Sequence, residues 1–522
     1  MAFDLGAESG RAMVGRLEAG RLEVREVRRF ANTPVRLSGH LPAGEGPSGT
    51  LRDPFGVLKG SSAALHWNVP ELFEEMMGGM AACAEGDYAI ASVGVDTWGV
   101  DFGLLDGDGN PLGLPYAYRD ERTEGAMEAF CDRMLRERVY ELTGIQFLRF
   151  NSLFQLFAMV REGSPLLEKA SDLLFMPDLF NYLLTREKKS EFTLATTSQL
   201  YNPRRDGWEP ELFEALGVPV GLMQEIVPPG TVIGRLTEDI GVEAGLGQTP
   251  VVATASHDTA AAVAAAPGEG EDWAYISSGT WSLMGVESPH PVIAEQSLAM
   301  NFTNEGGVGH TFRLLKNIMG LWLVQQCRRA WESERQYSYE ELGKSAAEAQ
   351  PFKAMIVPDD PGFMNPPDMP QAVAAFCERT GQPRPETPGE YVRCALESLA
   401  LKYRMTLEEL RLVWGRPIRR IHVIGGGAQN QLLCQLTANA TGVPVIAGPA
   451  EATAIGNLLV QAMAMGEVGS RVELREIVRR SFPVKPYQPE RSEEWEAAYG
   501  RFSELHQLYG RAAPLPPKRM SV

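Results

Sequence analysis

One carboxylate in a run of small side chains is the first candidate for chemistry. Asp258 follows His257 in the run Ala255–Ala260, which reads Ala-Ser-His-Asp-Thr-Ala, and small neighbours leave room for a substrate hydroxyl to approach. As a general base, such a group accelerates proton transfer by about 10²- to 10⁴-fold. Aspartate also caps helix N-termini readily. The run alone leaves both interpretations open.

Turns rich in glycine and hydroxyl groups flank this aspartate in the chain. The first is Asp4–Arg11, Asp-Leu-Gly-Ala-Glu-Ser-Gly-Arg, and the second is Ser277–Thr280, Ser-Ser-Gly-Thr. Glycines let a backbone approach phosphate oxygens while amides and hydroxyls donate hydrogen bonds. One such turn alone more often serves as a hairpin turn. An acid between two of them indicates a phosphotransferase, with Thr280 placed to donate to the transferred group.

The charged residues of the first turn have two interpretations each. Asp4 lies on an apolar strand, where a carboxylate is costly unless it pairs or holds a cation through water. Arg11 either neutralises phosphate or pairs with an acid.

Two later motifs are less specific signs of nucleotide and sugar binding. Gly425–Gly427 follows the apolar strand Ile421–Ile424 and precedes a helix predicted over Gln431–Ala440. The triplet lets an adenine ring lie flat on the backbone, or is simply a strand-to-helix turn. Asn317 lies in an apolar run that we predict to be helical. Its side chain either contacts a sugar or is a hydrogen-bonded structural amide.

The composition limits the classes of protein. With 522 residues, the chain exceeds the roughly 250 to 300 residues at which single cores stop growing, so we expect two large domains. The net charge of −18 repels nucleic acid, and no apolar run approaches the ~18 residues that span a bilayer. Any nucleotide bound here needs a screening cation, which predicts Mg²⁺.

The cysteines and the start of the sequence indicate a cytoplasmic protein. Six cysteines are scattered without a Cys-x-x-Cys spacing, which argues against a zinc site. We expect free thiols, although Cys377 and Cys394 remain a conceivable pair. The first residues lack the basic and apolar segments of a secretory signal. The sequence leaves open whether the protein is a monomer or a homodimer.

The pattern of strands predicts an internal duplication. A strand, a glycine turn and two further strands, Arg11–Leu17 and Leu22–Phe30, form a β-meander, and a second hairpin is predicted from Trp273–Ser277 and Ser282–Val286. We place the domain boundary near Gln248, giving domains 1–247 and 248–522.

Apolar strands at Ala89–Val95 and Val251–Ala255 deliver polar residues to their carboxyl ends, where ligands collect in α/β sheets. Asn32–Gly60 is predicted to be a surface loop, and the residues after Arg511 a frayed tail.

These residues resemble the FGGY carbohydrate kinases, of the superfamily that also holds actin and the heat-shock chaperone ATPases. The similarity runs from Asp4 to about Pro483. Within the family, Thr97-Trp98-Gly99 and Leu315–Gly320 point to the rhamnulokinase branch. The stretches that carry the resemblance are Gly94–Phe102, Leu114–Asp120, Thr143–Phe147, Ser256–Thr259, Ser277–Gly285, Asn304–Gly307, Leu315–Gln325 and Val445–Pro449.

The resemblance implies an α/β fold of two actin-like, ribonuclease H-like ATPase domains with a nucleotide and sugar cleft between them. It implies ATP and Mg²⁺ as cofactors, L-rhamnulose as acceptor, and Asp258 as proton acceptor. The implied sugar contacts are Gly99, His257, Asp258, Thr259 and Asn317. The implied nucleotide contacts are Ala7, Glu8, Ser9, Gly10, Arg11, Thr280, Gln325 and Gly426, and Asp4 is the implied magnesium-organising acid.

Two alternatives remain at this point. A kinase of the same family for another ketose or polyol, such as fuculose or xylulose, would share the motifs, since one hydroxyl contact redirects specificity. An actin-like or chaperone-like ATPase would hydrolyse ATP without sugar; the Asp258 run and the rhamnulokinase-like stretches argue against it.

Overall fold

The computed structural model describes residues 1–37, 64–86, 88–490 and 493–510. They form two compact units, which confirms the expected number of domains. The first unit comprises Met1–Gly15, Val24–Asp258 and Val460–Glu467; the second comprises Arg16–Glu23, Thr259–Leu459 and the described residues from Val468 onward. The boundary near Gln248 stays a prediction.

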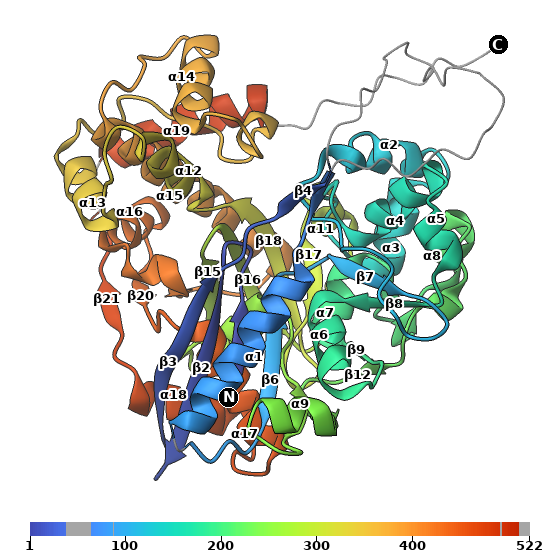
Figure 1. The fold of residues 1–522 in the computed structure, drawn as a ribbon. Helices are drawn as coiled ribbons and strands as arrows, with labels where there is room; N and C mark the ends of the chain where they lie inside the picture. Colours follow the sequence, from blue (N-terminus) through green and yellow to red (C-terminus); the bar gives the residue numbers. More distant parts are fainter. Residues whose placement is uncertain (38–63, 87, 491–492, 511–522) are drawn as a thin grey trace, which may run out of the picture. The chain divides into compact units, whose positions relative to one another are not determined.

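A six-stranded mixed sheet organises the first unit (Figure 1), in the order β13-β14-β6-β1-β2-β3. β1 is antiparallel to β2 and parallel to β6; β14 is parallel to β6 and antiparallel to β13. The predicted β-meander is confirmed. The strands are β1 (Ala2–Leu5), β2 (Ser9–Glu18), β3 (Arg21–Ala31), β6 (Val93–Thr97), β13 (Thr231–Arg235) and β14 (Pro250–Ala253).

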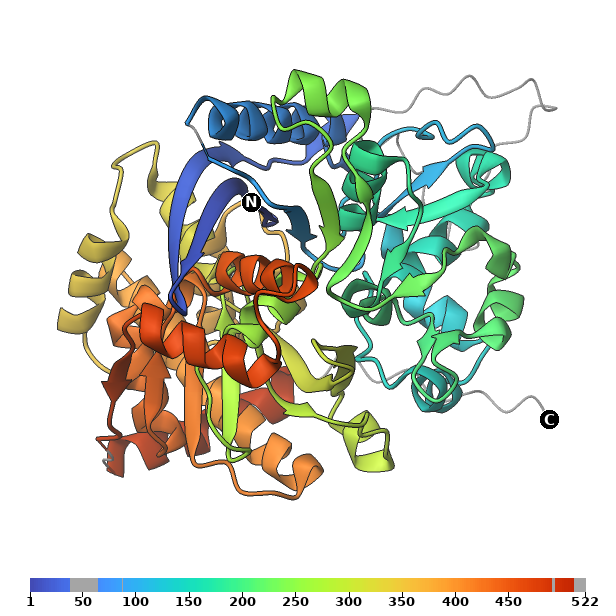
Figure 2. The ribbon, with the colours of Figure 1, turned by 90° about the horizontal axis from the view of Figure 1, so that it is seen from below.

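Helix α1 (Val69–Glu85) covers this sheet with one apolar stripe. Its buried residues include Leu72, Met76, Met80 and Cys83, at the three- and four-residue spacing of a helix face. At Gly79 a Cβ would lie 2.8 Å from the Cβ of Ala12 on β2, so the helix approaches the sheet too closely for a side chain there. Figure 2 shows α1 beside α9 (Glu238–Glu243).

The remainder of the first unit consists of short helices and two-stranded ribbons. The helices are α2 (Ala126–Cys131), α3 (Arg136–Thr143), α4 (Ser152–Arg161), α5 (Pro165–Lys169), α6 (Met176–Thr185), α7 (Phe192–Ala195) and α8 (Pro210–Leu216), with 3-10 turns η1 (Glu121–Thr123), η2 (Thr196–Ser198) and η3 (Val220–Leu222). The ribbons pair β4 (Val35–Leu37) with β5 (Ala64–His66), β7 (Phe102–Leu105) with β8 (Asp172–Phe175), β9 (Ser190–Glu191) with β12 (Ile226–Val227), and β10 (Tyr201–Asn202) with β11 (Gly207–Trp208).

The second unit repeats the sheet of the first. Its order is β17-β18-β16-β15-β19-β20-β21. β15 pairs antiparallel with β16, as β1 does with β2. On the other side of β15 lie the parallel strands β19 and β20 and then the antiparallel edge strand β21, which correspond to β6, β14 and β13. The predicted duplication and second hairpin are confirmed. The strands are β15 (Trp273–Ser278), β16 (Trp281–Ser288), β17 (Thr303–Gly306), β18 (Phe312–Met319), β19 (Arg420–Ile424), β20 (Val445–Ala447) and β21 (Lys485–Tyr487).

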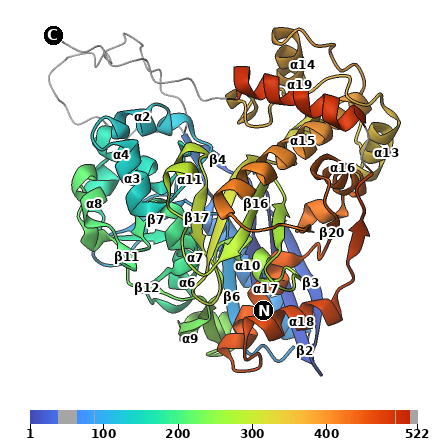
Figure 3. The ribbon, with the colours of Figure 1, turned by 180° about the vertical axis from the view of Figure 1, so that it is seen from behind.

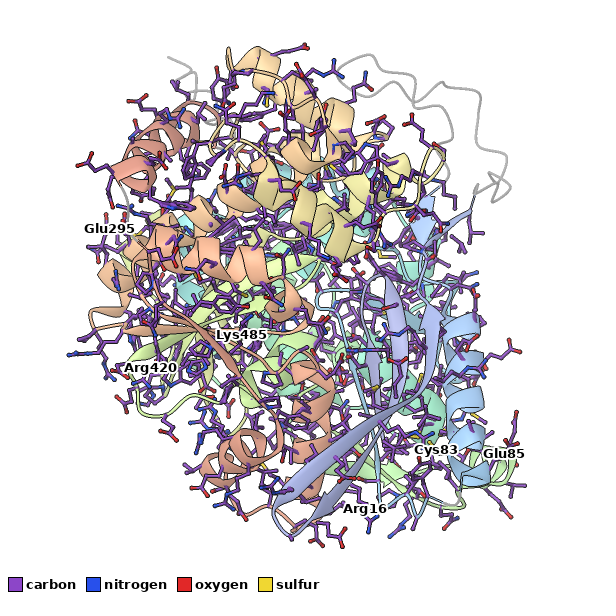
Figure 4. The ribbon with its side chains drawn as sticks, turned by 90° about the vertical axis from the view of Figure 1, so that its left-hand side faces the viewer. Arg16, Cys83, Glu85, Glu295, Arg420 and Lys485 are labelled. Carbon is purple, nitrogen blue, oxygen red and sulfur yellow. The ribbon has the colours of Figure 1, made fainter. Side chains whose placement is uncertain are left out.

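Helices pack on this second sheet around one large apolar core. α15 contributes Leu396, Leu399, Leu407 and Leu410 to it, and Figure 3 shows α15 running beside α16 and α19. The edge strand β21 carries Lys485 (Figure 4), whose ammonium donates to Gln431 Oε1 at 2.8 Å. The helices are α10 (Asp258–Ala264), α11 (Glu295–Ala299), α12 (Trp322–Trp331), α13 (Tyr339–Glu348), α14 (Met369–Arg379), α15 (Pro388–Trp414), α16 (Gln431–Thr441), α17 (Ala452–Ala464), α18 (Arg471–Ser481) and α19 (Glu493–Tyr509), with η4 (Pro361–Phe363) and η5 (Gly426–Gln429).

Several predicted segments differ in extent or type. The strand expected at Ala89–Val95 is Val93–Thr97, because Ala89 and Ala91 are exposed and pairing with the neighbouring strands begins at Val93. The helix expected around Asn317 is wrong. This run is strand β18, held between β16 and β17, and a short apolar run does not distinguish a buried strand from a buried helix.

Part of the loop predicted at Asn32–Gly60 is also wrong, because Val35–Leu37 forms β4. The rest of that loop from residue 38, and the tail predicted after Arg511, lie outside the described residues.

Candidate active site

The turn between β1 and β2 is tied down by its own backbone and by one asparagine. Gly6 N–H donates to Ser9 O at 2.9 Å, and Asn32, itself buried, donates from Nδ2 to Gly6 O at 2.7 Å and from its backbone N–H to Glu8 O at 3.0 Å. At Gly10 a Cβ would lie 2.1 Å from the ring of Phe30. The close approach of the Phe30 ring therefore accounts for a glycine at position 10. Ala7, Glu8 and Ser9 form the exposed and half-exposed edge of the turn.

Two carboxylates lie side by side beneath this turn. Asp4 on β1 is paired in register with Asp96 on the parallel strand β6 and with Arg11 on the antiparallel strand β2. Arg11 forms an ion pair with Asp4, as one of its two interpretations predicts. The two carboxylates supply the oxygen donors that Mg²⁺ prefers, and these residues therefore fit the implied ion. Sequence reasoning missed Asp96 as its partner.

The loop after β6 carries Gly99 in a strained setting. Val100 has φ +68°, a left-handed conformation that is a clear outlier for a β-branched residue. Ser152 Oγ donates to Val100 O at 2.5 Å, and Val100 N–H donates to Thr197 Oγ1 at 3.3 Å. These contacts hold the neighbouring Gly99 in place.

Asp101 anchors the far side of this loop. Its carboxylate accepts hydrogen bonds from the indoles of Trp67 at 2.6 Å and Trp98 at 2.9 Å, from Gln155 Nε2 at 2.7 Å and from Tyr118 N–H at 3.1 Å. Burial raises the pKa of Asp101 to about 6, and these four donors oppose the shift.

His257 and Asp258 lie at the start of α10. Asp258 is the first residue of the helix, and its side chain is 32% exposed. His257 Nε2 lies 3.3 Å from Asp258 Oδ1. A Cβ on Gly99 would lie 3.4 Å from both His257 Nε2 and Thr197 Oγ1. The first unit thus brings Gly99, His257 and Asp258 together, and adds Thr197, which the sequence analysis missed.

The turn between β15 and β16 is held by the segment that follows β18. Gly320 N–H and Trp322 N–H donate to Thr280 O at 3.1 and 3.2 Å, and Leu321 N–H donates to Gly279 O at 2.9 Å. A Cβ at Gly320 would lie 2.6 Å from the backbone of Trp281. The run Leu315–Gly320 ends in glycine because its last residue packs directly against the turn between β15 and β16.

The glycine triplet meets the same turn from the neighbouring strand. β15 and β19 are parallel, with Ser277 paired to Ile424, so both turns lie at carboxyl ends. A Cβ at Gly427 would lie 2.0 Å from Ser278 Oγ, whereas one at Gly426 would meet nothing within 4 Å. The exposed backbone at Gly426 leaves room for a planar ring.

The other predicted residues of the second unit lie on β18, α12 and α10. Asn317 on β18 is partly exposed and pairs with Leu283 on β16. Gln325 follows in the first turn of α12, where its Oε1 is buried without a hydrogen-bond partner among the described residues. Thr259 is buried as the second residue of α10. The second unit brings Thr280 and Gly426 together through Ser278.

The described part of the chain contains no helix both long and apolar enough to cross a membrane, and no cluster of three or more metal-binding side chains. The six cysteines are free thiols.

Comparisons with known proteins place the chain in a family. Residues 54–264 match the N-terminal domain and residues 274–465 the C-terminal domain of the FGGY family of carbohydrate kinases. The chain is 48% identical to the rhamnulokinase of Bacteroides thetaiotaomicron, over 96% of this chain and 98% of the relative, and 41% identical to that of Pectobacterium atrosepticum, over 97% and 96%.

The fold is also that of solved sugar kinases. The crystal structure of ligand-bound xylulose kinase from Lactobacillus acidophilus superposes with a TM-score of 0.74 at 14% identity, covering 98% of this chain and 97% of that one. The predicted fold class is confirmed. This chain belongs to the FGGY family of carbohydrate kinases.

Proposed function

We propose that the protein transfers the γ-phosphate of ATP to the C1 hydroxyl of L-rhamnulose, giving L-rhamnulose 1-phosphate and ADP in L-rhamnose catabolism. The relatives named rhamnulokinase, which share 38–48% identity over nearly the whole chain, support the choice of sugar. The observation that carries the chemistry is the partly exposed Asp258 carboxylate beside His257, whose ring in turn approaches Gly99.

Asp258 accepts the proton of the attacking hydroxyl in this proposal. The Asp258 side chain is 32% exposed beside the buried His257, which leaves it accessible to a substrate hydroxyl. Phosphoryl transfer needs little covalent chemistry, so positioning and charge neutralisation supply most of the rate. We assign sugar contacts to Gly99, His257 and Thr259, and also to Asn317.

We assign the nucleotide to two turns. The β1–β2 turn and the β15–β16 turn contribute amides and hydroxyls to the phosphates, and the open backbone at Gly426 receives the adenine. Gln325 Oε1, which has no hydrogen-bond partner among the described residues, is an acceptor for a donor group of the nucleotide. The assigned residues are Ala7, Glu8, Ser9, Gly10, Arg11, Thr280, Gln325 and Gly426.

Asp4 and Asp96 would hold Mg²⁺ through water or directly. When bound, the ion neutralises phosphate charge in a protein whose own net charge is −18. Free thiols are typical of the reducing cytosol, where we place the reaction.

The test is ADP release by purified protein with Mg-ATP and a panel of sugars: L-rhamnulose, L-fuculose, D-xylulose, L-ribulose and glycerol, beside a reaction without sugar. Preference for L-rhamnulose is the expected result. Preference for another sugar would overturn the substrate but keep the kinase, and release independent of sugar would overturn the kinase.

Asp258→Asn tests the assigned base. The expected fall in kcat is about 10²- to 10⁴-fold, with ATP binding retained in a calorimetric titration. Asp239→Asn is the matched control, because Asp239 is also an acid in the first turn of a helix, α9, but is exposed. Full turnover by Asp258→Asn would remove Asp258 from this role.

A further inference from the structure

One buried segment connects the loops that carry Gly99 and Asp258. It runs from Glu191 to Thr197, through the end of β9, helix α7 and the start of η2. Four of its side chains are polar and at most 5% exposed. Thr196 donates within the segment, to Thr193 O at 3.1 Å, and the other three are Glu191, Thr193 and Thr197. Buried polar groups are costly unless they are hydrogen-bonded, so the partners of these three side chains indicate what the segment does.

Two of its side chains hold the backbone just before Asp258. Glu191 Oε2 accepts a hydrogen bond from Ser256 N–H at 3.2 Å, and Thr193 Oγ1 accepts one from His257 N–H at 3.1 Å. The Thr193 hydroxyl donates in turn to Glu191 Oε2 at 2.5 Å. Consecutive amides of the Asp258 loop are therefore held by one linked pair of side chains.

The third side chain holds the Gly99 loop. Thr197 Oγ1 accepts from Val100 N–H at 3.3 Å and donates to Leu194 O at 2.8 Å. The strained φ of Val100 requires such external contacts to persist. The same segment therefore holds the backbone of both loops, which come together where His257 Nε2 approaches Gly99.

The charge of Glu191 follows from its hydrogen bonds. Besides Ser256 and Thr193 Oγ1, it accepts from Thr193 N–H at 2.9 Å and Leu194 N–H at 3.2 Å, so both oxygens face donors. A protonated carboxyl would point its own hydrogen at one of these donors. The buried neighbour Asp178 accepts from Glu191 N–H at 3.1 Å through Oδ1, while its Oδ2 has no hydrogen-bond partner among the described residues.

The proton of this acid pair therefore resides on Asp178. Burial and the adjacent Glu191 raise the pKa of Asp178 well above its usual value, and two neighbouring buried carboxyls do not both ionise. Burial raises the pKa of Glu191 as well, but only to about 7, because its donors oppose the shift; Glu191 is therefore the member of the pair that ionises first.

We propose that Glu191 and Thr193 are positioning residues of the phosphoryl transfer, which fix the backbone of Ser256 and His257 and so the direction of the Asp258 carboxylate. This inference rests on the proposed role of Asp258. Misplacing a catalytic group by about 1 Å lowers turnover about 10²-fold, so the contribution of these residues is measurable in kcat.

The experiment compares Thr193→Val with Thr193→Ser in the full chain, using L-rhamnulose and Mg-ATP. Valine keeps the shape of threonine but removes the hydroxyl that joins His257 N–H to Glu191; serine keeps the hydroxyl. We expect Thr193→Val to lower kcat about 10- to 100-fold with the KM for ATP unchanged, and Thr193→Ser to restore most of kcat. Rates are expressed per ATP-binding site titrated, so loss of folded protein does not count as loss of turnover.

The matched control is Thr143→Val. Thr143 is also buried, and its hydroxyl donates to Val139 O at 2.9 Å and accepts from Ile145 N–H at 3.3 Å, outside the Glu191–Thr197 segment and both loops. This variant should keep the wild-type kcat per titrated site. Where Thr193→Val does not fold, Thr193→Cys replaces it, because a thiol is similar in size but a weak acceptor.

The outcomes separate this inference from the function on which it rests. An inactive Asp258→Asn beside a fully active Thr193→Val would overturn the positioning role alone. An active Asp258→Asn would overturn the proposed base. Equal losses of kcat in Thr193→Ser and Thr193→Val would also overturn the positioning role, because the hydroxyl would then not matter.

Discussion

Asp4 and Asp96 occupy paired positions of the parallel strands β1 and β6, 6% and 0% exposed. Paired residues of neighbouring strands project their side chains on the same face of a sheet. Adjacent carboxylates repel each other strongly in a buried setting, and here Arg11 forms an ion pair with Asp4. Arg11 thus neutralises the charge of Asp4, while the carboxylate of Asp96 lies beside it on β6.

The metal dependence of the reaction should follow this pair. We expect Asp96→Asn to raise the Mg²⁺ concentration for half-maximal rate by about tenfold or more, since a carboxylate is a far better Mg²⁺ ligand than an amide. Initial rates over a Mg²⁺ series at fixed ATP measure it. Asp108→Asn, in an exposed turn, should keep the wild-type curve, and an unchanged curve for Asp96→Asn would exclude this acid from the metal site.

The contact between Gly427 and Ser278 predicts a large effect from one methyl group. Gly427→Ala would place its Cβ 2.0 Å from Ser278 Oγ and 2.5 Å from Ser278 Cβ, so we expect a fall of about 1–3 kcal/mol in unfolding free energy from overpacking and a higher KM for ATP. Urea unfolding and ATP titration measure the two effects. Gly426→Ala, with open space at its Cβ, should leave stability unchanged.

A second substitution checks the cause. Ser278→Gly removes both atoms that Gly427→Ala would meet, so the double variant should recover part of the stability that Gly427→Ala alone loses. Strictly additive losses would mean that the two positions do not clash.

Local sequence signals predicted the elements that carry the site, but not the contacts that set its geometry. The hairpin turns and Asp258 stand out because glycines and β-branched runs mark them in the chain. Glu191 and Thr193 carry no such mark. Their partners Ser256 and His257 lie 65 and 64 residues away, and only the folded backbone brings them together. The prediction of a helix around Asn317 is wrong because β18 is buried on both faces, and such a strand lacks the alternation of apolar and polar residues that would mark it in the sequence.

Asp178 should keep its proton to a higher pH than an ordinary aspartate, because burial and the neighbouring Glu191 raise its pKa. Its raised pKa means that the folded protein holds a proton that the unfolded chain releases above about pH 4, so this group lowers stability as pH rises from there towards its folded pKa. Asp178→Asn mimics the protonated form and retains an acceptor for Glu191 N–H. We expect the variant to be at least as stable as wild type at pH 7, by urea unfolding, and to show a shallower decline between pH 5 and pH 7. A variant much less stable at pH 7 would show that Asp178 is ionised there.

His422 on β19 should make the protein sensitive to acid. It is 3% exposed, neither ring nitrogen has a hydrogen-bond partner among the described residues, and the edge-on ring of Trp273 lies 5.3 Å away. Burial, together with Arg420 (Figure 4), Arg475 and Arg479, lowers the pKa of His422 to about 4.

Because the unfolded chain takes up this proton near pH 6.5 and the folded protein only near pH 4, stability is lost as pH falls between these values, by at most about 3 kcal/mol. His422→Phe keeps an aromatic ring against Trp273 and removes the titration. Urea unfolding of both proteins at pH 7, 5.5 and 4.5 should therefore show a stability difference that shifts in favour of the variant as the solution becomes more acidic. His290→Phe, at an exposed position, should follow wild type. If His422→Phe and wild type lost stability in parallel, His422 would be taking up its proton equally well in the folded protein, and the three arginines and the burial would not be acting on it as described.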